Sequence, residues 1–176
     1  MTAETVFSRT VFRGQVLTVR VDTVKFADGK TTKREIVGYG DAVAMVAIDG
    51  AGNVLLVKQY RHAAGMELLE IPAGGIEPGE RPEQAAAREM REETGFLPAS
   101  IIPLGGFYSA PGYSTEFLHL FLARDLTPSP LVAEDTGDIS LVKVPLSQVA
   151  GFIRDGSIRD GKSVAGLLSY LCLKPA

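Results

Sequence analysis

The sequence has little of the chemistry on which many protein classes depend. Its 176 residues include one cysteine, two histidines and no tryptophan. One cysteine excludes an intramolecular disulfide, so the chain must fold through its apolar core. That cysteine, Cys172, lies in the apolar run LLSYLCL, and no histidine lies near it in sequence. We therefore expect a buried structural thiol there rather than a nucleophile.

The sequence also lacks a large excess of positive or negative charge, and it has no long apolar run. The formal net charge is -3, which gives no electrostatic footprint for DNA or RNA. No run of 18 apolar residues occurs, and the first ten residues lack a basic segment followed by an apolar one. These features predict a cytoplasmic protein that binds neither nucleic acid nor membrane.

What remains is an ordinary globular composition, with 45% hydrophobic and 22% charged residues. Alternating residues on either side of the Asp28-Gly29 turn predict an N-terminal β hairpin. Gly38 and Gly40 mark a boundary, which suggests a strand region at 1–40 and a main domain at 41–176. A chain of this length fits one domain with a small appendage.

The main domain mixes strands and helices. The apolar runs AVAMVAI and NVLLVKQY predict central strands buried on both faces, and AGGIEPGE predicts a loop. A helix should begin at Pro82 and stop at Gly95, followed by further strands and two closing helices. This order predicts an α+β fold, an α/β/α sandwich with a mixed sheet, preceded by a small antiparallel β hairpin domain.

Three glutamates crowd the end of the predicted helix. At α-helical spacing Glu89, Glu92 and Glu93 share one face, where like charges repel and the helix dipole disfavours carboxylates. They are either a solvated face, with Arg88 pairing Glu92, or a cation site. Because His62 and His119 are the only histidines, an oxygen site for Mg²⁺ or Mn²⁺ fits better than a zinc site.

The surrounding residues favour the cation site. The stretch GGIEPGERPEQAAAREMREETGF, residues 74–96, resembles the Nudix hydrolase signature at every defined position. The resemblance implies hydrolysis of a nucleoside diphosphate linked to another group, with Mg²⁺ or Mn²⁺ as cofactor. The implied metal-site residues are the Ala73 carbonyl, Glu80, Glu89, Glu92 and Glu93. Arg88 would orient these glutamates, and Gly74 and Gly75 would let backbone approach the substrate. A bound ion would relieve the repulsion, so replacing Glu92 or Glu93 by Gln should slightly stabilise the metal-free protein.

Residues outside the signature bear on the substrate. Pro111, sixteen residues after Gly95, and the form Pro-Gly-x-Ser-x-Glu resemble the ADP-ribose pyrophosphatase subgroup and its nucleotide-sugar relatives. The resemblance implies substrate contacts from Arg61, Glu70, Pro111, Gly112 and Glu116. Each has a plainer reading. Arg61 could be a solvated strand end, Glu70 a solvent-facing strand residue, and the Pro111 segment a simple turn. Glu70 could also position Arg61 rather than contact the substrate.

The sequence leaves four acidic residues as candidates for the catalytic base. The resemblance implies a glutamate on a loop after the signature, and the candidates are Glu134, Asp135, Asp138 and Glu116, with Glu134 preferred for its reach. The implied activity is hydrolysis of ADP-ribose to AMP and ribose 5-phosphate by a homodimer. The alternatives are hydrolysis of another nucleotide sugar such as GDP-mannose, cleanup of oxidised nucleoside triphosphates, and a non-catalytic ADP-ribose sensor.

Overall fold

The structure is a computed structural model of the chain that describes residues 3–132 and 139–173. Its Cα positions fall into two units. One contains Met1–Asp41 and Tyr108–Phe117, and the other contains Ala42–Phe107 and Leu118–Ala176. Each unit has its own sheet, and the two are described separately below.

The first unit is a three-stranded antiparallel sheet in the order β1-β2-β3. Its strands are β1 (Ala3–Arg13), β2 (Thr18–Phe26) and β3 (Thr31–Gly38). The predicted hairpin is β2 and β3. Gly29 turns it with φ of 83°, a left-handed conformation that costs glycine little. The segment 108–117 joins this sheet, since the Thr115 N–H donates to the Val37 carbonyl at 3.0 Å.

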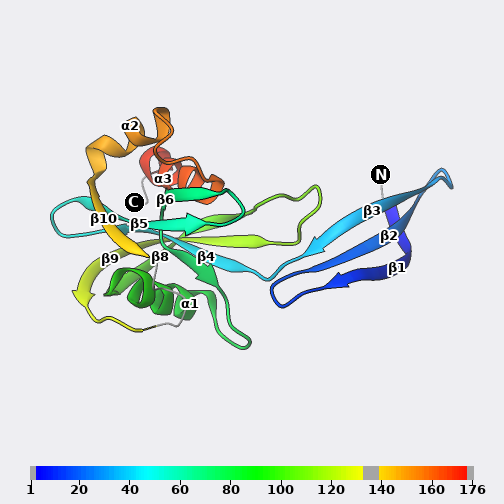
Figure 1. Cartoon of the computed structure of the whole chain (residues 1–176), viewed down its shortest axis with the longest axis horizontal. Helices are drawn as coiled ribbons and strands as arrows, with labels where there is room; N and C mark the ends of the chain where they lie inside the picture. Colours follow the sequence, from blue (N-terminus) through cyan, green and yellow to red (C-terminus); the bar gives the residue numbers. More distant parts are fainter. Residues whose placement is uncertain (1–2, 133–138, 174–176) are drawn as a thin grey trace. The chain divides into compact units, whose positions relative to one another are not determined.

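The second unit is built on a seven-stranded mixed sheet (Figure 1). The path β10-β5-β4-β9-β8 forms its main body, β6 pairs with β5, and β7 pairs with β4. The β4–β9 pair is parallel, whereas β4–β5 and β5–β10 are antiparallel. The strands are β4 (Ala42–Ile48), β5 (Asn53–Arg61), β6 (Met66–Glu70), β7 (Ala73–Gly75), β8 (Phe96–Tyr108), β9 (Phe117–Pro128) and β10 (Ser140–Pro145).

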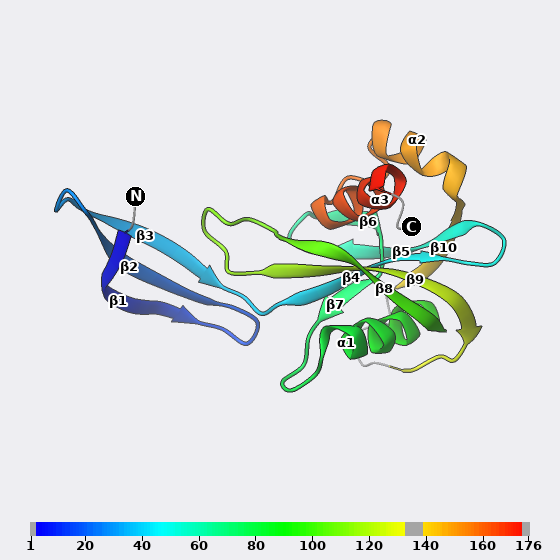
Figure 2. The same cartoon turned by 180° about the vertical axis from the view of Figure 1, so that it is seen from behind.

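Helices cover both faces of this sheet, as Figures 1 and 2 show. On one face α1 (Pro82–Glu89) buries Ala85 and Ala86 against Met45 and Leu55. On the other face lie α2 (Val149–Arg154) and α3 (Gly161–Leu173), which follow a short 3₁₀ turn at Leu146–Gln148.

All seven residues of β4 are buried, as expected for a central strand. Burying each large aliphatic side chain contributes about 1.5–3 kcal/mol, so β4 anchors both cores.

Two expectations about local structure were wrong. Residues 73–75 form the short strand β7, not loop, because their backbone pairs with Ala42–Ala44 of β4. Cys172 is exposed, since it lies on the outer side of α3 despite its apolar neighbours in sequence. Within residues 3–132 and 139–173, no helix has the length and apolar content needed to cross a membrane.

Candidate active site

The helix that carries the site begins as the sequence predicts but ends differently. Pro82 is its first residue, and the Arg81 N–H donates to the Gln84 side-chain oxygen at 3.0 Å. The α-helical hydrogen bonding stops at Glu89, and Met90–Thr94 form a π-helical turn. Gly95 then ends the segment with φ of 78°. The prediction of a continuous α-helix up to Gly95 was therefore wrong in its last turn.

The π turn changes which partners the glutamates reach. A turn with i→i+5 bonding is wider than an α-helical turn and is found frequently at functional sites. Here Glu89 and Glu92 stay beside Arg88, while Glu93 reaches the backbone of Ala73. Two of the three carboxylates are thus paired with a guanidinium and the third with a backbone N–H, so they do not share one α-helical face as predicted.

Arg88 is the centre of the acidic cluster, which we define as Glu80, Glu89, Glu92 and Glu93. Its Nε and Nη2 donate to the two oxygens of Glu80 at 3.0 and 2.9 Å. Its Nη1 donates to Glu89 at 2.6 Å and to Glu92 at 3.0 Å. These bonds raise the pKa of Arg88 and, for Glu80, lower the pKa of the carboxyl. One guanidinium therefore orients three carboxylates, as only a rigid fork of donors can.

A glycine makes the close approach of strand and helix possible. A Cβ added at Gly74 would lie 2.0 Å from the carboxyl carbon of Glu89 and 2.1 and 2.3 Å from its oxygens. Real atoms cannot approach so closely, so any other residue would displace the Glu89 carboxylate. The same strand holds Glu93, because the Ala73 N–H donates to Glu93 Oε2 at 3.0 Å.

Glu93 is the glutamate whose charge the protein tolerates least. Burial and, to a smaller extent, the neighbouring Glu89 charge raise its pKa to about 8, against the opposing effects of Ala73, Lys162 and Arg61. At neutral pH the metal-free site therefore favours the protonated form of Glu93. A nearby cation would reverse this preference, since opposite charge stabilises a carboxylate.

The donor set fits a hard divalent cation. Carboxylates of the acidic cluster and the carbonyl of Ala73 are the oxygen ligands that Mg²⁺ prefers. In the described part of the chain, no three His, Cys, Asp or Glu side chains already converge at metal-binding spacing. The glutamates are instead arranged around Arg88, which contacts one oxygen each of Glu89 and Glu92.

A second polar group lies at the end of β5. Arg61 Nε and Nη2 donate to Glu70 at 3.0 and 2.6 Å, and Glu70 is 2% exposed. Burial opposes ionisation of Glu70, yet Arg61 and Lys162 outweigh it and hold its pKa below the usual value. The reading of Glu70 as a solvent-facing residue was therefore wrong: Glu70 fixes Arg61, whose side chain remains 39% exposed.

A family model of the NUDIX domain matches residues 38–166. The chain belongs to the Nudix family. A Bacillus subtilis (strain 168) relative named ADP-ribose pyrophosphatase is 35% identical over 175 residues, 98% of this chain and 94% of the relative. A Citrobacter koseri relative named GDP-mannose pyrophosphatase is 32% identical over 160 residues, 85% of this chain and 82% of the relative. The crystal structure of an ADP compounds hydrolase superposes with a TM-score of 0.89 at 25% identity, covering 97% of this chain and 93% of the other. These matches confirm the family and the fold class predicted from the sequence.

Other expected residues of this Nudix protein belong to the first unit or lie outside the described residues. Pro111 and Gly112 form a turn in the first unit, where the Ser114 N–H donates to the Ala110 carbonyl at 2.8 Å. Glu116 is in the same unit. The candidate bases Glu134, Asp135 and Asp138 lie outside the described residues.

Sequence reasoning missed Lys162 and Asp160, which join the Arg61–Glu70 pair. Lys162 Nζ donates to Glu70 and, at 2.9 Å, to Asp160. The run RDGKS carried a local signal, because Asp before a helical segment predicts an N-cap. Nothing in the sequence indicated that Lys162 would meet Glu70, a residue 92 positions away.

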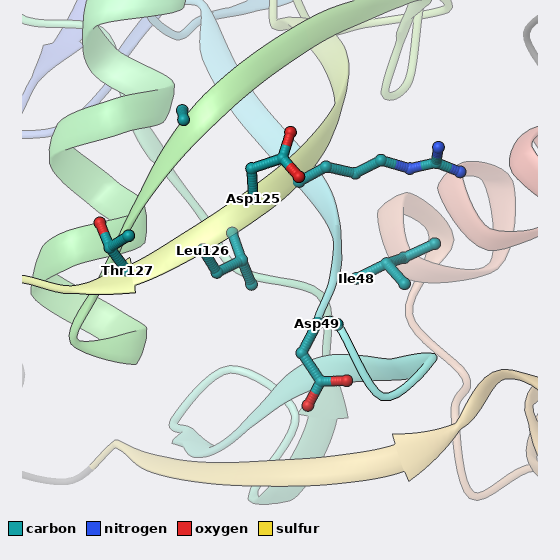
Figure 3. A pocket seen from close by; sticks show the side chains of 8 residues that line it. Ile48, Asp49, Asp125, Leu126 and Thr127 are labelled. Atoms are coloured by element: carbon teal, nitrogen blue, oxygen red, sulfur yellow. The ribbon is translucent and has the colours of Figure 1, made fainter.

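The Nudix domain also has a surface pocket away from this site (Figure 3). It is lined at the carboxyl ends of β4 and β9 by Ile48, Asp49, Arg124 and Asp125, among others, and measures about 570 Å³. The acidic cluster instead contacts β7, which pairs with the amino end of β4. The Asp49 carboxylate in this pocket already accepts bonds from Asn53 and Lys143.

Proposed function

We propose that this Nudix protein hydrolyses ADP-ribose to AMP and ribose 5-phosphate. The observation that carries the proposal is the arrangement of Glu80, Glu89 and Glu92 around Arg88, with Glu93 held at the backbone of Ala73. Such a group of oxygens suits a divalent cation, which would in turn bind the pyrophosphate. The name of the Bacillus subtilis relative, which aligns with 98% of the chain, supports ADP-ribose as the substrate.

The proposed cofactor is Mg²⁺, with Mn²⁺ as a substitute. The residues that would hold it are Glu80, Glu89, Glu92, Glu93 and the carbonyl of Ala73. When bound, the ion would polarise the pyrophosphate, lower the pKa of the attacking water and neutralise the leaving phosphate. Oxygen ligands with no sulfur favour these ions over zinc.

The chain's own side chains would bind and orient the substrate. Arg61 is proposed to bind pyrophosphate oxygens; the proposal is supported by its planar donors, which Glu70 fixes, and by its accessible side chain. Gly74 and Gly75 would let the backbone approach the phosphates. Pro111 and Gly112 are proposed to shape the substrate side of the site.

Glu134 is proposed as the base that takes a proton from the attacking water, with Glu116 as the second choice. Glu134→Gln should lower kcat for ADP-ribose at least 100-fold while leaving KM within threefold, since a base acts mainly in the transition state. Glu116→Gln is the matched control. If Glu116→Gln has the larger effect on kcat, the assignment passes to Glu116.

We further propose that the protein is a homodimer joined through the strand region at 1–40. All eleven residues of β1 are exposed, and Phe7 and Phe12 are 60% and 55% exposed. Exposed apolar side chains of this size mark association surfaces. Phe7→Ser with Phe12→Ser should shift the mass measured by light scattering to that of a monomer. A monomeric wild-type protein would exclude this proposal.

The activity is tested by measuring AMP release from ADP-ribose with Mg²⁺, beside a panel of nucleotide sugars that includes GDP-mannose. Faster turnover of ADP-ribose than of the panel supports the proposal. Turnover of GDP-mannose alone would favour the activity named for the Citrobacter koseri relative. Binding of ADP-ribose with no product would favour the sensor.

A further inference from the structure

The first turn of α3 is tied to the strand that supports the active site. The Asp160 carboxylate caps the helix, since its Oδ2 accepts a bond from the Ser163 N–H at 3.1 Å. The Ser163 hydroxyl in turn accepts a bond from the Ile71 N–H at 2.8 Å. Lys162, between these two, donates to Glu70 and Asp160. Lys162 and Ser163 of α3 thus hold Glu70 and Ile71, the two residues that precede Pro72 and β7, and Asp160 supports both from the position before the helix.

Glu70 is the shared partner of two cations. Its Oε2 accepts from Arg61 Nη2 at 2.6 Å and also from Lys162, while its Oε1 accepts from Arg61 Nε at 3.0 Å. Because Glu70 is 2% exposed, water cannot replace a missing donor without rearrangement. The position of Arg61 therefore depends on the position of Lys162.

The charge balance of this group makes Lys162 hard to replace. Asp160 Oδ1 is buried and accepts no hydrogen bond from the described residues. Loss of the Lys162 charge would leave the buried Glu70 and the half-buried Asp160 with Arg61 as the nearest cation in the network. Arg61 would then be drawn inward by two carboxylates, away from the accessible orientation that a pyrophosphate requires.

We propose that Lys162 is a positioning residue of the hydrolytic site, which holds Arg61 through Glu70 in the orientation that binds the substrate's pyrophosphate. The inference rests on the proposed function, because it assigns Arg61 to that anion. It adds a role for α3, which lies outside the signature at 74–96. Lys162 itself contacts carboxylates of the protein, so it acts through Arg61.

The test is a double-mutant cycle of Lys162→Met and Arg61→Met, assayed with ADP-ribose and Mg²⁺. Lys162→Met should raise KM about tenfold and change kcat less than threefold, since a misplaced Arg61 weakens substrate and transition state alike. The double variant should have the KM of Arg61→Met alone. Lys162→Arg, which keeps the charge, should stay within about threefold of wild type. Lys143→Met is the control, because Lys143 pairs with Asp49 on a different surface.

Two results would overturn the role of Lys162: a KM for Lys162→Met equal to that of Lys143→Met, or penalties that multiply in the double variant. A drop in melting temperature without a change in KM would equally reduce Lys162 to a structural residue. If circular dichroism shows that Lys162→Met is unfolded, Lys162→Gln is measured against the same criteria. Arg61→Met with a wild-type KM would instead contradict the proposed contact of Arg61. If only GDP-mannose is hydrolysed, the substrate assignment fails and the same cycle on GDP-mannose decides the role of Lys162.

Discussion

Replacing Glu93 by Gln should stabilise the metal-free protein and abolish its activity. The carboxyl of Glu93 has a pKa of about 8 because it is buried beside Glu89, against 4.5 for an ordinary glutamate. Gln has no charge to bury, and its side-chain oxygen can still accept the bond from the Ala73 N–H. The substitution therefore removes a destabilising group while it keeps the backbone contact.

The sign of this stability change follows from how the charge of Glu93 depends on pH. A carboxyl whose folded-state pKa lies above its unfolded value favours the folded state most below about pH 4.5, and that advantage is lost as the pH rises through 8. At pH 7 the cost of Glu93 is at most about 3 kcal/mol, from roughly 1.4 kcal/mol per pKa unit. Side-chain relaxation reduces it, so we expect Glu93→Gln to raise the free energy of unfolding by about 1–3 kcal/mol.

The assay is urea unfolding in EDTA at pH 4.5, 7 and 8.5. The gain of Glu93→Gln over wild type should be near zero at pH 4.5 and largest at pH 8.5. With Mg²⁺ the order should reverse, because the ion stabilises the state that binds it and wild type binds it better.

Glu92→Gln is the matched control for this experiment. Its carboxylate accepts a bond from Arg88 at 3.0 Å, so we expect no gain in stability from Glu92→Gln. The sequence alone predicted a slight gain for both Glu92→Gln and Glu93→Gln. A gain for Glu93→Gln that does not change with pH, or no gain at pH 8.5, would refute the account of Glu93 as a buried, repelled charge.

Two further changes probe the same site, and a third probes Asp49 on a different surface. Gly74→Ala should lower the free energy of unfolding in urea by only about 1–2 kcal/mol, since the Glu89 side chain can move away from the new Cβ. The displaced Glu89 carboxylate should nevertheless lower kcat at least 100-fold. A fully active variant would contradict the close approach of Gly74 and Glu89. Arg88→Gln should destabilise the metal-free protein by about 2–3 kcal/mol, because three carboxylates lose their cation, and Mg²⁺ should restore part of that loss; equal stability with wild type in EDTA would count against this. The pKa of Asp49 is lowered to about 2, chiefly by the Asn53 N–H. The stability that this carboxylate contributes is therefore present above pH 4 and is lost as the pH falls through 2. Asp49→Asn should make the free energy of unfolding depend less on pH in this acidic range.

Local patterns predicted much of this protein correctly. The residues Pro82 and Gly95 bound the helical segment as expected, since a proline at the first helical position and a left-handed glycine at the end depend on nearby backbone alone. The apolar run of β4 was recognised as a buried strand, because a strand covered on both faces needs no alternation. For β5 the same prediction was right only for residues 54–57, since Lys58 and Tyr60 in its second half are exposed. Spacing also identified the glutamates around Arg88, whose contacts to Glu89 and Glu92 lie within one helical turn.

Errors occurred where a residue's environment comes from distant parts of the chain. Residues 73–75 became a strand because β4 offers them backbone partners, and Cys172 is exposed because packing fixed which side of α3 faces the sheet. The π turn at Met90–Thr94 also lay beyond local propensity. It brings Glu93 to Ala73, a contact across 20 positions.

The sequence by itself determined the family of this protein, and the spacing of the signature singled out Glu80, Glu89, Glu92, Glu93 and Arg88 as the residues proposed to carry the reaction. Tertiary structure alone decided how those charges are balanced. It buried Glu70 between Arg61 and Lys162, and it set Gly74 against Glu89 so closely that a Cβ there would displace the Glu89 carboxylate. The physical reason is that a carboxylate's charge depends on the donors and the water around it. The fold supplies those donors from strands and helices that are far apart in the chain.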